Sequence, residues 1–129
     1  MRNKTRIPDA LFARLLQVVG CTAPFRVVYG PPDAVSGQAT RSGGIVLRIP
    51  SASLDKIDMA YLILDVMVHE VKHWLDYSTP LHFDYDAPHS RRPQERRAER
   101  AVVSFRRRVM TGRVAPPDAV VLELAENLP

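Results

Sequence analysis

Residues 54–77 read LDKIDMAYLILDVMVHEVKHWLDY. No glycine or proline interrupts it, so it can form one helix about 36 Å long at about 1.5 Å per residue. Apolar side chains occupy one side of that helix, namely Ile57, Ala60, Leu64, Met67, Val68, Val71 and Leu75. The other side carries a polar stripe of Asp55, Asp58, Asp65, His69, Lys72, His73 and Asp76. The pattern predicts an amphipathic helix that packs through its apolar side.

Within this helix, His69 and His73 lie one turn apart, and Glu70 follows the first of them. Side chains at i and i+4 share a face, so two imidazoles can approach one metal ion at about 2 Å from each nitrogen. Glu70 lies about 100° around the helix. It falls beside Ile63 and Trp74, where an unpaired carboxylate is costly unless it lines a cleft. A solvated polar face is the alternative interpretation of the histidine stripe.

The arginine-rich segment at residues 91–113 supplies a second observation, because it carries nine arginines and only two acids, Glu95 and Glu99. The spacing predicts a helix over residues 94–110, with most arginines on one face and apolar side chains on the opposite face. Both acids fall on or beside the apolar face, and carboxylates directed into a core need a cation. A metal ion held by the two histidines would supply it, and Arg106 is the alternative partner.

The order His69-Glu70-x-x-His73, then Glu95, then Glu99 resembles the pattern of gluzincin metallopeptidases. The order of predicted elements is similar to that of small ImmA/IrrE-like and minigluzincin domains. The resemblance implies one Zn²⁺ per chain, bound by His69, His73 and Glu95, with Glu70 as general base in peptide-bond hydrolysis. It also implies that Glu99 orients a histidine ligand, at a position where the family usually has aspartate. The expected protein is a zinc-dependent endopeptidase with a peptide or protein substrate.

The expected fold is of the α+β class and zincin-like. A helix at residues 10–20 and strands at 25–29 and 45–49 precede the long helix. We expect a small, mostly antiparallel or mixed sheet of about three strands, packed on the N-terminal and long helices, with residues 31–42 as a loop. The glutamate-bearing helix and a short C-terminal helix at 117–128 complete the fold. The C-terminal helix is expected to pack against the domain, or alternatively to cover the cleft.

Further site residues are expected on the long helix and on the strand before it. Asp65 and Asp76 each lie one turn from the histidines and are candidate acceptors for a ligand N–H, with a solvated surface acid as the alternative role. In the folds that this sequence resembles, the strand before the active helix lies at the rim of the cleft. Ile45, Val46 and Leu47 are therefore candidates for pairing with an extended peptide substrate.

The loop at residues 78–93 contributes the remaining candidates. His82 and His89 are alternative third metal ligands, if the loop folds back onto the helix. Tyr77, His82, Tyr85 and His89 are candidate stabilisers of the oxyanion that forms during hydrolysis.

Composition limits the class of protein. The chain has 46% hydrophobic and 25% charged residues, typical of a single domain spanning residues 1–129. One cysteine, Cys21, cannot form an internal disulfide. Asp9 and Arg14 interrupt the N-terminal apolar run, which argues against a signal peptide, and no segment has the ~20 apolar residues of a membrane span. These features predict a cytoplasmic protein with no membrane partner.

Two other function classes remain open. The net charge of +4 is concentrated in residues 91–108, whose arginine face predicts a nucleic-acid-associated regulatory module that contacts phosphates. The second class is a catalytically silent zinc-binding relative that serves only in interactions.

Overall fold

A computed structural model describes Ile7 and residues 9–20, 24–30, 35–40, 44–50, 55–110 and 117–128, and Cys21 lies outside these ranges. The elements are α1 (Asp9–Val19), β1 (Phe25–Tyr29), β2 (Ser36–Thr40), β3 (Gly44–Ile49), α2 (Lys56–Asp76), the 3₁₀ turn η1 (His89–Arg91), α3 (Pro93–Met110) and α4 (Pro117–Glu126). The predicted α+β class and the three-stranded mixed sheet are confirmed.

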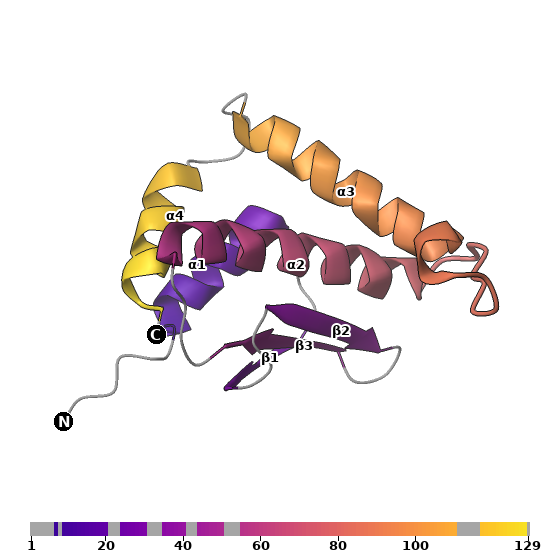
Figure 1. The fold of residues 1–129 in the computed structure, drawn as a ribbon, viewed down its shortest axis with the longest axis horizontal. Helices are drawn as coiled ribbons and strands as arrows, with labels where there is room; N and C mark the ends of the chain where they lie inside the picture. The colour runs from indigo at the N-terminus through magenta and orange to yellow at the C-terminus, as the bar shows by residue number, and fades with distance from the viewer. Residues whose placement is uncertain are drawn as a thin grey trace.

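Helix α2 is the centre of the molecule. Figure 1 shows it between the sheet on one side and α3 on the other. The Asp55 side chain caps its start by accepting a hydrogen bond from the Asp58 amide at 3.0 Å. Helix α3 crosses α2 at an angle and moves away from it toward its own C-terminal end (Figure 1). Contacts between the two helices include the Glu95–histidine contacts at the start of α3 and the Arg106–Asp65 ion pair further along it.

The sheet has the strand order β1-β3-β2, with β1 parallel and β2 antiparallel to β3. Strand β3 is thus central, and Ile45 pairs with Phe25 on one side and with Ala39 on the other. The expectation that Ile45, Val46 and Leu47 pair with a substrate peptide is wrong, because both edges of β3 are already occupied. The expected loop at residues 31–42 contains strand β2, which forms an edge of the sheet.

The hydrophobic core lies around the apolar side of α2. Buried side chains of α2, α1, β3 and α4 meet there, among them Leu11, Leu15, Leu47, Ile49, Ile63, Met67, Val121 and Leu124. Ile57 and Leu75, which the pattern placed on the same side, are exposed. Burial of this face fixes the rotation of α2 about its axis and so determines where its polar stripe points.

Helix α4 belongs to this core. It packs against α1 and α2, and Val121, Leu124 and Leu128 are buried in the cluster. The expectation that the C-terminal helix packs against the domain is confirmed. Within the described ranges, no helix combines the length and the apolar character that crossing a bilayer would need.

Candidate metal centre

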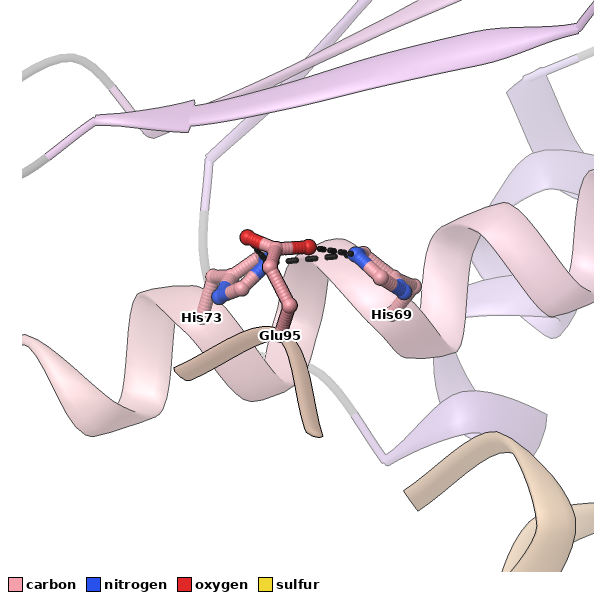
Figure 2. A group of neighbouring side chains, drawn as sticks. All are labelled: His69, His73 and Glu95. Carbon is pink, nitrogen blue, oxygen red and sulfur yellow. Dashed lines mark hydrogen bonds and ion pairs between the residues drawn. The ribbon is translucent and has the colours of Figure 1, made fainter. Parts of the chain in front are cut away.

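His69, His73 and Glu95 point toward one another at the start of α3 (Figure 2). His69 Nε2 lies 3.1 Å from Glu95 Oε1, and His73 Nε2 lies 3.0 Å from Glu95 Oε2. The two imidazole Nε2 atoms are 3.1 Å apart. The i, i+4 spacing places both histidines on one face of α2, and α3 brings Glu95 against that face. The structure therefore brings together the three ligands expected from the sequence.

While Glu95 is ionised, no arrangement of protons on the two imidazoles satisfies all three contacts. Each neutral imidazole carries one N–H, so a proton on both Nε2 atoms leaves two donors facing each other at 3.1 Å. Moving either proton to Nδ1 turns an Nε2 lone pair toward the Glu95 carboxylate. Burial lowers the pKa of the His73 imidazole, although the nearby Glu95 carboxylate opposes the shift. The neutral form that a metal ligand requires is therefore favoured at His73 by burial.

These donors fit a zinc ion. The two Nε2 atoms lie 3.1 Å apart, so at metal–ligand bonds of about 2.0–2.1 Å they would subtend about 95–102° at the metal, not far from the tetrahedral arrangement that zinc prefers. One Glu95 oxygen lies within 4.8 Å of both nitrogens. Two imidazoles and one carboxylate form a donor set that leaves a fourth position for water. Among the described residues, this is the one group of three or more histidine, cysteine, aspartate or glutamate side chains close enough to share an ion.

Glu70 lies beside this cluster and is buried. Burial raises the pKa of its carboxyl above the ordinary value, and the Glu95 charge adds to the shift, while His69 and a backbone hydrogen bond from Ala39 oppose it. Gly37 of β2 is in close contact with it, because a Cβ at that position would lie 2.6 Å from Glu70 Cγ. The carboxyl is thus held between α2 and the edge strand.

A cavity of about 220 Å³ opens over the cluster. It is lined by His69, Glu70 and His73 of α2, by Gly37, Gln38 and Ala39 of β2, by Gln94 and Glu95 of α3, and by Tyr77, Tyr85, His89 and Arg92. Sequence reasoning missed the contributions of β2, Arg92 and Gln94. The sequence signal for β2 was weak. It consisted of two small residues, Gly37 and Ala39, at alternate positions, which leave room for a helix to pack close to the strand.

Two side chains that follow the loop in the sequence, Arg92 and Gln94, hold the loop over this cavity in place. Gln94 is buried, and its amide pairs with both backbone groups of Asp84, at 3.1 and 3.0 Å. Arg92 donates to the carbonyls of Ala87 and Tyr85. His89 Nε2 is thereby held 3.2 Å from Glu95 Oε1, although its side chain is 72% exposed.

The other loop and tyrosine candidates divide into two groups. Tyr77 lines the cavity and donates its hydroxyl to the Ala39 carbonyl at 3.3 Å, and Tyr85 lines the cavity from an exposed position. His82 is exposed and is not among the described residues that line the cavity, and its carbonyl accepts a hydrogen bond from Arg97 Nη1 at 3.0 Å. The expectation that His82 serves as ligand or oxyanion stabiliser therefore finds no support in its position.

Asp65 and Asp76 are paired with cations instead of histidines. Asp65 forms an ion pair with Arg106, so the alternative in which Arg106 neutralises Glu95 or Glu99 is wrong. Asp76 is buried and accepts from Arg97 Nε at 2.8 Å and Lys72 Nζ at 3.0 Å. The ion pairs of both acids are with these cations, and their role in orienting a histidine ligand stays a prediction. The alternative role as a solvated acid is also wrong for Asp76.

Glu99 lies one turn beyond Glu95 and is exposed, contrary to the expectation that both acids face inward. It lines a neighbouring cavity of about 420 Å³ together with His69, Glu70 and Asp65. A contact between Glu99 and His69 stays a prediction.

No family model, curated protein or solved structure matches this chain. The site's own side chains define its chemistry: three converging side chains that could hold a metal ion, a buried carboxyl beside them, and a cavity that an edge strand borders.

Proposed function

We propose that the protein is a zinc-dependent metallopeptidase of the gluzincin type, with a zincin-like fold and one zinc ion held by His69, His73 and Glu95. The observation that carries the proposal is the convergence of these side chains, with contacts of 3.0–3.1 Å that protons on the two imidazoles cannot all satisfy while Glu95 is ionised. A cation between them resolves the conflict, because all the lone pairs then point at a positive charge.

The bound zinc would lower the pKa of a water molecule and polarise the carbonyl of the scissile peptide bond. Glu70 is positioned to take the proton of that water as its oxygen adds to the carbonyl carbon. The same carboxyl then delivers the proton to the peptide nitrogen as the C–N bond breaks, which leaves a carboxylate and an amine. Its raised pKa suits a group that must both accept and return a proton near neutral pH.

Strand β2 supports an extended substrate better than β3 does, because one of its edges carries no strand among the described residues. The Ala39 carbonyl accepts a hydrogen bond from the Tyr77 hydroxyl, and the Ala39 backbone also forms a hydrogen bond with the Glu70 carboxyl. These backbone groups of Ala39 therefore face away from β3. Backbone groups alternate in direction along a strand, so those of Gly37 face the same open edge. We infer that a peptide pairs with Gly37 and crosses the cavity toward His89 and Tyr85, the candidates for contacting the oxyanion.

Metal content and peptide cleavage together test the proposal. The purified protein should contain one zinc per chain, and Glu95→Ala should lose it, while Glu126→Ala, at an exposed position of α4, should not. Glu70→Gln should retain zinc and lower the cleavage of a fluorogenic peptide library by about 10²–10⁴-fold, the usual contribution of a general base. Unchanged cleavage by Glu70→Gln would contradict the mechanism.

The alternative of a catalytically silent zinc protein gives a different result. Such a protein binds zinc through the same three residues, yet neither the wild type nor Glu70→Gln cleaves any member of the library. Absence of zinc from the wild type under zinc-supplemented purification would contradict both the peptidase and this alternative.

A further inference from the structure

A second cluster of charges lies on η1 and the first turns of α3, outside the group of His69, His73 and Glu95. Arg91, Arg96 and Arg100 are exposed, and their guanidinium groups have no hydrogen bond or ion pair within the described part of the chain. Together with His82, Pro93 and Arg97 they line a cavity of about 410 Å³, and none of the described residues that line it is acidic.

These three arginines differ from their neighbours in the same segment. Arg92 is used to hold the loop, through the carbonyls of Ala87 and Tyr85, and Arg106 is paired with Asp65. A general shortage of acids near α3 would leave unpartnered arginines scattered along the helix. The unpartnered guanidinium groups instead surround one cavity.

The inner wall of the cavity also carries excess positive charge. Arg97 donates to Asp76, but Asp76 also pairs with Lys72, so one carboxylate serves two cations. Arg97 Nη2 is buried and has no hydrogen-bond partner among the described residues. A buried guanidinium N–H without an acceptor is costly, and an anion brought into the cavity can offset part of that cost through the surrounding field.

The positive surface continues along the helix. A neighbouring cavity of about 500 Å³ shares Arg97 and Arg100 with the first and adds Lys72, Ser104 and Arg108. Positions 96, 100, 104 and 108 are one helical row, with steps of about 6 Å between successive members. The row therefore offers several donors in line, which suits a chain of anions better than a single one.

We propose that this row, with Arg91, binds the phosphate backbone of duplex DNA. Guanidinium groups match phosphate oxygens in geometry and charge, and a row of them can contact successive phosphates without reading bases. The one aromatic residue of α3, Phe105, is buried, so the face lacks the stacking side chains that bind single strands. Figure 1 shows α3 on the side of α2 opposite the sheet, where a duplex can approach it.

The test is fluorescence anisotropy with a labelled 20-base-pair DNA duplex between about 50 and 200 mM salt. If Arg91, Arg96 and Arg100 each neutralise one phosphate, the slope of log K against log salt should be near −2.7, which corresponds to binding about 40-fold weaker at the upper end of this range. Arg96→Gln/Arg100→Gln should reduce the slope by about two and weaken binding at low salt at least tenfold.

The matched control is Arg26→Gln/Arg48→Gln, which removes the same charge from the outer face of the sheet. Retained DNA binding by this control, together with its loss in the α3 variant, supports the proposal. No binding at 50 mM salt, or equal losses in both variants, would overturn it. If polyglutamate displaces the labelled duplex as well as unlabelled DNA of the same total charge does, the assignment to phosphate is contradicted. If a chelator abolishes binding, the contact depends on a metal ion and not on the arginines.

Discussion

The two sides of the start of α3 carry unmatched charges of opposite sign. On the side facing α2, the ligand atoms of His69, His73 and Glu95 lie within 4.8 Å of one another, so electron pairs are in excess. On the other side, unpartnered arginines line a cavity in which no described lining residue is acidic. Between the two sites, the Lys72–Asp76–Arg97 group is held together by its own ion pairs.

This contrast shows how the fold uses its charges. Where opposite charges can meet, they pair: Arg14 with Glu123 between α1 and α4, and Arg106 with Asp65 between α3 and α2. Groups of like character gather at the two sites above, and we propose that each takes a partner from outside the chain, a cation at one and an anion at the other. Predictions for the three regions should therefore differ in kind.

Metal removal should have the largest effect. A ligand that binds only the folded state stabilises it by about 4 kcal/mol when its free concentration is about a thousand times Kd. Zinc should thus raise the Tm by roughly 12 °C, at about 3 °C per kcal/mol, and a chelator should reverse the shift. Differential scanning fluorimetry checks this, with Glu95→Ala as the variant whose Tm should no longer respond. A wild-type Tm that does not change with zinc would contradict the proposed metal site.

The internally paired group should respond to mutation but not to zinc. Asp76→Asn removes the carboxylate that serves two cations in a buried position, and loss of one partner of a buried pair costs about 3 kcal/mol or more. Asp65→Asn is the matched control, because its partner Arg106 is exposed and such pairs contribute about 0–1 kcal/mol. Urea denaturation measures both. Equal losses would mean that burial of Asp76 does not distinguish the two pairs.

The approach of His69, His73 and Glu95 could be predicted from the sequence because most of its geometry is local to two helices. Helical spacing puts His69 and His73 on one face, and the position of Glu95 beside the apolar face of its own helix turns it toward them. The fate of Glu99 could not be predicted in the same way. It depends on the angle at which α3 crosses α2, and that angle is set by packing along both helices.

Strand β2 was missed for a related reason. Residues 36–40 read SGQAT, which carries little β-propensity. The segment is a strand because β3 offers an edge to pair with, and because two small residues let it approach α2. Asp76 likewise looked like a surface acid on the polar stripe, but α3 covers that end of the stripe and supplies Arg97. Each of these features is decided by contacts between elements distant in the sequence.

The close approach of β2 to α2 gives the prediction with the smallest expected effect. Gly37→Ala places a methyl group 2.6 Å from Glu70 Cγ and 2.9 Å from Val66 Cγ1, so the strand or the Glu70 side chain must move. Such overpacking costs about 1–3 kcal/mol. Under the proposed mechanism, displacement of Glu70 should also lower peptide cleavage while zinc stays bound.

Gln38→Ala is the matched control for this change, because Gln38 is the exposed neighbour on the same strand. Its stability in urea should stay within about 0.5 kcal/mol of the wild type. If Gly37→Ala is equally neutral in both stability and cleavage, β2 does not fix Glu70. The buried carboxyl would then have to be held by α2 alone, and the site would be open to movement on the side where a peptide is proposed to bind.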